Sequence, residues 1–128
     1  TLNPGGVRLG TAEIYSEVEK FKQVKESLAV GQSWDNDIRI ILFIILNKGY
    51  DLNNDLVKKI KKQIRINASP RHVPEKIISV TDIPRTKNGK IVELAVKNTI
   101  EGNKIKNKEA LANPEILKEY VNIKELND

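Results

Sequence analysis

The feature that most constrains the fold is an apolar run, "IRIILFIIL", at residues 38–46. A membrane-spanning helix needs about 20 apolar residues, and this run has the length of a strand. A strand that is apolar on both faces is typical of the middle of a sheet that is covered by helices. The run therefore predicts a central strand of a helix-covered sheet.

The other elements follow from the spacing of apolar residues and from residues that favour turns. Residues 31–39, "GQSWDNDIR", carry turn residues and are expected to connect two strands. The pattern predicts helices at 12–21, from 53 or 54 to 65 and at 91–98, strands at 24–31 and 76–83, and one or two short helices near the end. This order favours an α+β fold with a small mixed β-sheet flanked by helices. The length of 128 residues predicts a single domain at 1–128.

Residues at the expected helix ends fit known capping preferences. Thr11 and Asn53 or Asn54 precede helices as N-caps, and Asn113 is placed as the cap of the last helix. Pro114 takes the first helical position, where a missing N–H does no harm. Gly102 closes the helix before it.

Composition excludes several classes of site. The chain has no cysteine and one histidine, so disulfides, thiolate metal sites and a zinc or iron site are not expected. The opening "TLNPGGVRLG" is neither a signal nor a transit peptide, and no run is long enough to span a membrane. We expect a cytoplasmic protein without a membrane partner, and the absence of an initial methionine suggests a piece of a longer chain.

A basic cluster interrupts an otherwise ordinary charge distribution. Within eight residues lie Lys58, Lys59, Lys61, Lys62 and Arg65, in a chain of net charge +5. Such a cluster attracts phosphate groups, although it is also common on the solvated face of a helix. A stand-alone nucleic-acid or anion-binding module is therefore one alternative. It is weakened because the six aromatic residues do not interleave with the basic run.

The loop "DIPRTKNGK", residues 82–90, ends in a lysine at its tip. Gly89 allows backbone conformations that other residues avoid. Lys90 could be an exposed residue without a specific function. Alternatively, the chain could be a structural or regulatory interaction domain whose Lys90 loop docks on a partner. Inserted into the cleft of another domain, its ammonium could instead stabilise two anions as they react.

Two motifs bear on these alternatives: "GGVRLGTAEIYSEVE" at 5–19 and "DIPRTKNGKI" at 82–91. A basic helix and an "SPRHVP" turn lie between them. In this order, they resemble the small C-terminal domain of adenylate-forming enzymes, the acyl-CoA synthetases and their relatives. "TLNPGGVRLGTAEIY", "GKIVELAVKN" and "KNKEALANPE" are most similar to the acetoacetyl-CoA synthetases of this superfamily. Acetyl-CoA and propionyl-CoA synthetases, the alternative, carry an arginine-rich stretch where this chain has Val92, Glu93 and Leu94.

The resemblance implies a two-step reaction. Acetoacetate would react with ATP and Mg²⁺ to give an acyl-adenylate and pyrophosphate, and coenzyme A would then displace AMP. It also implies that Lys90 is catalytic and binds the nucleotide, and that Arg8 binds the nucleotide. Coenzyme A would be contacted by Gly5, Gly6 and Arg65.

The resemblance also defines what this chain would lack. The main partner would be a large N-terminal domain that binds ATP and Mg²⁺, and the hinge residue would fall just before Thr1. This chain alone is expected to be inactive, and no nucleic-acid partner is expected. His72 is expected to pack or hydrogen-bond, without a catalytic role.

Overall fold

The computed structural model describes residues 10–103, 108–121 and 123–127. The chain divides into two compact units, Thr1–Thr81 (the first unit) and Asp82–Asp128 (the second unit). The expectation of a single domain at 1–128 stays a prediction. In the part of the chain that is described, no helix is both long and apolar enough to cross a membrane.

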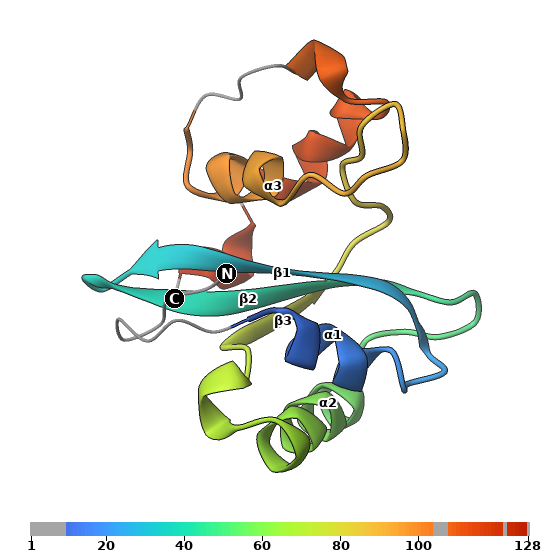
Figure 1. Ribbon diagram of the computed structural model, residues 1–128, viewed down its shortest axis with the longest axis vertical. Helices are drawn as coiled ribbons and strands as arrows, with labels where there is room; N and C mark the ends of the chain where they lie inside the picture. The colour runs from blue at the N-terminus through green and yellow to red at the C-terminus, as the bar shows by residue number, and fades with distance from the viewer. Residues whose placement is uncertain (1–9, 104–107, 122, 128) are drawn as a thin grey trace. The chain divides into compact units, whose positions relative to one another are not determined.

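The first unit is built on a three-stranded sheet in the order β1-β2-β3 (Figure 1). Strand β1 (Val24–Trp34) pairs antiparallel with β2 (Asp37–Leu46), and β2 pairs parallel with β3 (Lys76–Ser79). The apolar run thus forms the central strand, as predicted. The sheet is small and mixed, which confirms the predicted fold class.

The connection between β1 and β2 is tighter than the sequence suggested. The turn predicted over 31–39 is wrong, because only Asp35 and Asn36 lie between the two strands. Both have positive φ, 51° and 61°, as in the two-residue turns that match the twist of a hairpin. Cross-strand contacts extend the strands to this turn. The Arg39 guanidinium lies 3.9 Å from the centre of the Trp34 ring, and its Nε donates to Gln32 Oε1 at 2.8 Å.

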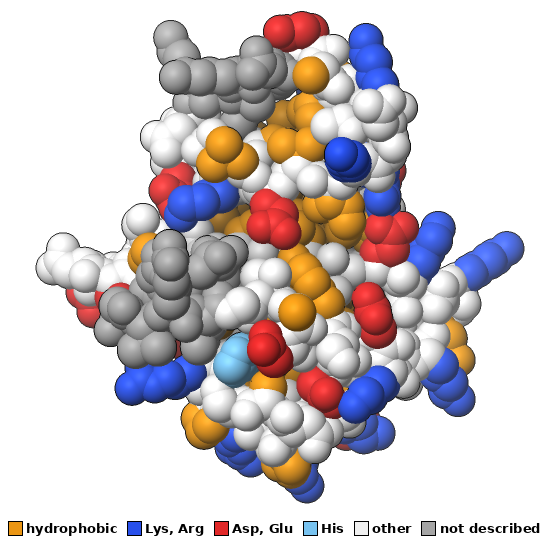
Figure 2. Space-filling model, viewed as in Figure 1, with side chains coloured by type: hydrophobic (Ala, Val, Ile, Leu, Met, Phe, Trp, Pro, Cys, Tyr) orange, Lys and Arg blue, Asp and Glu red, His pale blue; other side chains and the backbone are white. Residues whose placement is uncertain are grey.

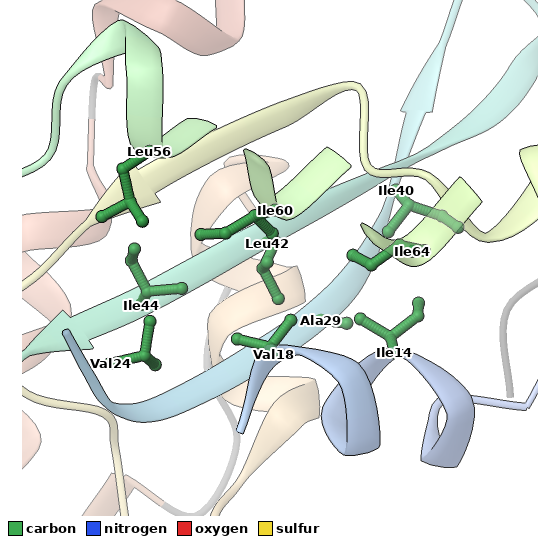
Figure 3. Close-up of a cluster of buried hydrophobic side chains, with 10 residues drawn as sticks. All are labelled: Ile14, Val18, Val24, Ala29, Ile40, Leu42, Ile44, Leu56, Ile60 and Ile64. Atoms are coloured by element: carbon green, nitrogen blue, oxygen red, sulfur yellow. The ribbon is translucent and has the colours of Figure 1, made fainter. Parts of the chain in front are cut away.

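Helices α1 (Ala12–Val18) and α2 (Asn54–Asn67) lie on the same side of the sheet (Figure 1). Their apolar faces pack on alternate residues of the strands, as side-chain alternation along a strand requires. The core cluster contains Ile14 and Val18 of α1, Val24 and Ala29 of β1, Ile40, Leu42 and Ile44 of β2, and Leu56, Ile60 and Ile64 of α2 (Figure 3).

The ends of the helices correct some expectations. Asn53 Oδ1 accepts a hydrogen bond from the Leu56 N–H at 2.8 Å, so Asn53 and not Asn54 is the N-cap of α2. Thr11 occupies the N-cap position of α1, but its side chain makes no capping bond. Helix α1 ends before the predicted residue 21, because the chain turns and the Phe21 N–H bonds to the Val18 carbonyl.

The second unit contains α3 (Glu93–Ile100) and short 3-10 helices η3 (Lys108–Ala110), η4 (Pro114–Tyr120) and η5 (Lys124–Asn127). The helix predicted at 91–98 is thus present, shifted by two residues, and Gly102 ends it with φ 76°. A small cluster of Ala95, Leu111 and Leu117 forms a core, with Val92 packed against it.

Candidate functional site

Lys90 closes a tight hairpin turn of the second unit. The Thr86 N–H donates to the Lys90 carbonyl at 2.8 Å, and the Gly89 N–H donates to the Thr86 carbonyl at 2.9 Å. The Lys90 N–H donates to Thr86 Oγ1 at 3.1 Å. Gly89 has φ 84°, a conformation that favours glycine, and Arg85 and Ile91 pair across the turn. Hydrogen bonds to Thr86 therefore fix the backbone of Lys90.

The side chain of Lys90 is exposed, as are those of Lys87 and Asn88 in the same turn. Within the described ranges the Lys90 ammonium has no hydrogen-bond or ion-pair partner. A lysine held only by its backbone can carry its charge outward, away from its own unit. The catalytic role of Lys90 stays a prediction.

A cluster of hydrogen bonds holds the start of the Lys90 loop. Asn113 Oδ1 accepts from the Arg85 N–H at 2.9 Å, while Asn113 Nδ2 donates to the Ile83 carbonyl at 3.1 Å and to Asp82 Oδ2 at 3.2 Å. The Tyr120 hydroxyl donates to the Asp82 carbonyl at 2.8 Å. Sequence reasoning placed Asn113 at a helix cap. It does precede η4, but its side chain makes no capping bond and turns to the loop instead.

Tyr120 is fully buried. Burial, followed by the negative charge of Glu119, raises the pKa of the Tyr120 hydroxyl well above its usual range. The hydroxyl is therefore protonated at neutral pH and remains a donor to the loop.

Two of the five cations in the basic cluster on α2 have hydrogen-bond or ion-pair partners. Lys59 Nζ pairs with Asp55 Oδ2 at 3.0 Å, and Lys61 Nζ donates to the Glu75 carbonyl at 3.1 Å. The remaining three cations are exposed and spaced at i, i+4 and i+7: Lys58, Lys62 and Arg65. This spacing places them along one side of the helix. We call these three residues the basic stripe.

Arg65 lies at one end of the basic stripe, in the last turn of α2. A cation at this position interacts favourably with the negative end of the helix dipole. The neighbouring Ile66 is 65% exposed, so the helix end presents a guanidinium beside an apolar side chain. On the face drawn in Figure 2, basic and acidic side chains are interspersed rather than gathered in one large basic patch.

A buried carboxylate joins the end of α2 to α1. Glu17 accepts hydrogen bonds from Asn67 Nδ2 at 3.0 Å, Lys20 Nζ at 3.1 Å and Gln63 Nε2 at 3.3 Å. The bond from Asn67, followed by the bond from Lys20, lowers the pKa of the Glu17 carboxyl below its usual range. The network ties the turn that carries Arg65 to the neighbouring helix.

Two further predictions have different outcomes. His72 Nδ1 lies 2.6 Å from Ser69 Oγ, and its Nε2 lies 4.0 Å from Glu13 Oε2, so the predicted hydrogen-bonding role is confirmed. Gly5, Gly6 and Arg8 lie outside the described residues. In the described part of the chain, no group of three histidine or acidic side chains is placed to bind a metal ion.

Comparisons with known proteins identify the family. The model of the AMP-binding enzyme C-terminal domain matches residues 13–90. An acetoacetyl-coenzyme A synthetase of Rhizobium meliloti (strain 1021) is 58% identical over 98% of this chain, which covers 19% of that protein. The solved acetoacetyl-CoA synthetase from Streptomyces lividans superimposes with a TM-score of 0.82 at 35% identity, over 95% of this chain and 19% of its own.

A solved structure of another acyl-CoA synthetase matches a smaller share of the chain. A Brucella canis acyl-CoA synthetase shares the fold, with a TM-score of 0.70 at 23% identity, over 76% of this chain and 18% of its own. This chain thus spans about a fifth of the length of the relatives it matches. The family match includes α1, the sheet, α2 and the loop that ends at Lys90, and the chain therefore belongs to the AMP-binding enzyme C-terminal domain family.

Proposed function

We propose that this chain is the small C-terminal domain of an acetoacetyl-CoA synthetase. The observation that carries the proposal is the 58% identity to such a synthetase over 98% of the chain. The family match ends at residue 90, whereas the acetoacetyl-CoA synthetase similarity continues through the tail. The whole enzyme would convert acetoacetate, ATP and coenzyme A into acetoacetyl-CoA, AMP and pyrophosphate, with a large N-terminal domain as the main partner of this chain.

In the first step, a carboxylate oxygen of acetoacetate attacks the α-phosphate of ATP, and pyrophosphate leaves. Two anions must approach each other, and a positioned cation lowers the free energy of that approach and of the transition state. We assign this role to Lys90. Its exposed ammonium and its hydrogen-bonded backbone support the assignment.

In the second step, the thiol of coenzyme A attacks the acyl carbon of the adenylate, and AMP leaves. We assign Arg65 to a phosphate of coenzyme A, because a guanidinium can hold a phosphate with two hydrogen bonds. Its exposure at the end of the basic stripe supports the assignment. Arg8, as a contact of the nucleotide phosphate, and Gly5 with Gly6, beside the pantetheine arm, complete the proposed site.

We assign Mg²⁺ and most contacts of ATP to the large domain, as the resemblance to adenylate-forming enzymes implies. This division predicts that the chain alone does not catalyse either step.

The proposal that this chain serves such an enzyme can be tested with a full-length enzyme in which this chain replaces the segment that it matches in the Rhizobium meliloti relative (the test enzyme). The test enzyme should release AMP and pyrophosphate with acetoacetate, and a folded test enzyme without this activity would contradict the proposal. We assign the acyl pocket to the large domain, so the substrate is tested with the native enzyme that contains this chain: its kcat/KM should be at least tenfold higher for acetoacetate than for acetate or propionate, on the order of what a distinct acyl pocket provides. A preference of that native enzyme for acetate or propionate would overturn the assignment.

The coenzyme A assignment predicts a selective effect of Arg65→Ala in the test enzyme. The loss of a charge-assisted phosphate contact should raise the KM for coenzyme A by about tenfold and leave the KM for ATP within about twofold. Lys58→Ala, at the opposite end of the basic stripe, is the matched control. An unchanged KM for coenzyme A in Arg65→Ala would contradict the assignment.

A further inference from the structure

We propose that Asn113 is a positioning residue for Lys90, and that Tyr120 supports it. The two side chains lie in the tail of the chain and hold the start of the loop whose end presents the lysine. This inference rests on the proposed adenylation role of Lys90.

Both the oxygen and the nitrogen of the Asn113 side-chain amide form hydrogen bonds with the loop. Its oxygen accepts from the Arg85 N–H, and its nitrogen donates to the Ile83 carbonyl and the Asp82 carboxylate. An N–H requires an acceptor and a carbonyl requires a donor, so only one orientation of the amide satisfies this arrangement. Asn113 therefore fixes the backbone on both sides of Pro84.

Further hydrogen bonds continue this attachment along the loop. The Tyr120 hydroxyl donates to the Asp82 carbonyl at 2.8 Å, and the Ala112 N–H donates to the Arg85 carbonyl at 2.8 Å. Leu111 pairs with Thr86, the residue that bonds to the backbone of Lys90. The tail thus holds residues 82, 83, 85 and 86, and Thr86 transmits this restraint to Lys90.

The restraint matters because the Lys90 side chain has no partner of its own in the described part of the chain. The direction of its ammonium then depends on the backbone from which it extends. Displacement of a reacting group by about 1 Å can lower a rate by about a hundredfold. A loosened loop should therefore slow adenylation, while the thioester step, which does not use Lys90, should continue.

The tail also lies outside the part of the chain that the family model matches, which ends at residue 90. It is shared with the acetoacetyl-CoA synthetases, which match nearly the whole chain. The contacts of Asn113 and Tyr120 thus come from the part of the chain beyond the family match.

The inference can be tested with Asn113→Ala in the test enzyme. The acetoacetate-dependent exchange of pyrophosphate into ATP should slow by about tenfold, while thioester formation from preformed acyl-adenylate stays within about twofold. Asn47→Ala is a matched control, because Asn47 Nδ2 also donates to a backbone carbonyl, that of Lys22 at 2.8 Å, in the first unit. This control should keep the ratio of the two half-reactions unchanged.

A double-mutant cycle separates positioning from a general structural role. If Asn113 acts through Lys90, adding Asn113→Ala to Lys90→Ala should produce no further loss of pyrophosphate exchange. Additive losses, or equal losses in both half-reactions, would overturn the inference and leave the proposed function intact. Full exchange activity of Lys90→Ala alone would overturn the inference together with the adenylation role assigned to Lys90.

A milder variant covers the case in which Asn113→Ala does not fold. Tyr120→Phe removes only the hydroxyl that donates to Asp82 and keeps the buried ring. It should lower pyrophosphate exchange selectively by about threefold to fivefold, as expected for the loss of one hydrogen bond. Unchanged exchange in this variant would count against the inference.

Discussion

In the part of the chain that the structure describes, one cluster of the first unit contains ten buried apolar side chains from α1, β1, β2 and α2, and one cluster of the second unit contains three. The second unit buries further apolar side chains, among them Ile83, Val96 and Tyr120, and adds hydrogen bonds from Asn113 and Tyr120 to the backbone of the 82–90 loop. Apolar burial supplies stability without fixed directions, while hydrogen bonds fix directions at a smaller gain in stability. The first unit thus carries Arg65 on a helix packed on an apolar core, whereas hydrogen bonds orient the loop that carries Lys90.

The largest expected effect concerns the core of the first unit. Ile60→Ala removes a fully buried side chain and should lower the free energy of unfolding by about 2–5 kcal/mol. Urea unfolding followed by fluorescence measures this, because Trp34 is the only tryptophan and lies in the first unit. Ile66→Ala, at an exposed position of the same helix, should change the free energy by less than about 0.5 kcal/mol. Similar losses in both variants would contradict the assigned core.

An intermediate effect is expected for the second unit. Tyr120→Phe removes one hydrogen bond and should lower local stability by about 1 kcal/mol, which corresponds to about fivefold faster hydrogen exchange of amides in residues 82–92. The urea midpoint reported by Trp34 should not change. If that midpoint fell together with the local protection, the two units would not be energetically distinct.

Ionisation of the Tyr120 hydroxyl should make the local stability of residues 82–92 sensitive to alkaline pH. The pKa of Tyr120 is raised in the folded state, so its contribution to stability is present below the ordinary tyrosine pKa and is lost as pH rises through the folded value. Protection of residues 82–92 should therefore decrease above about pH 10. Tyr120→Phe should weaken this dependence, and an identical dependence in the variant would rule out Tyr120 as its source.

The smallest effect is confined to acid pH and to the first unit. The pKa of Glu17 is lowered on folding, so its contribution is present above the ordinary glutamate pKa and is lost as pH falls through the folded value. Glu17→Gln should make unfolding, followed by Trp34 fluorescence, less dependent on pH below about 4.5. Glu19→Gln, at an exposed position, is the control. Equal acid sensitivity of Glu17→Gln and the unmodified chain would contradict this source.

Sequence patterns predicted the elements whose periodicity is strong. The run at 38–46 was long and apolar enough to specify a central strand, and α2 followed from its apolar stripe and its asparagine cap. The hairpin turn was predicted too long, because propensity suggests a turn across "GQSWDNDIR" while the contact of Trp34 with Arg39 and the pairing partners decide its length.

The candidate site was predictable only in part. The motif at 82–91 made Lys90 a candidate, but no local pattern indicates that Asn113 reaches back about 30 residues to the same loop. Because Asn113 precedes Pro114, the sequence predicted that its side chain would cap a helix. In the structure the side chain makes no capping bond and donates a hydrogen bond to the Ile83 carbonyl. Pairings of this kind depend on how the chain folds back on itself and leave no periodic signal in the sequence.

The most direct test of the central claim compares Lys90→Ala with Lys87→Ala in the test enzyme. Both lysines are exposed in the same turn, but only Lys90 is assigned to adenylation. Lys90→Ala should slow acetoacetate-dependent pyrophosphate exchange by about 10²–10³-fold and leave thioester formation from preformed adenylate within about threefold. Lys87→Ala should leave both half-reactions nearly unchanged. Equal losses in the two half-reactions of Lys90→Ala, or no loss in either, would contradict the claim that this loop presents the catalytic cation of adenylation.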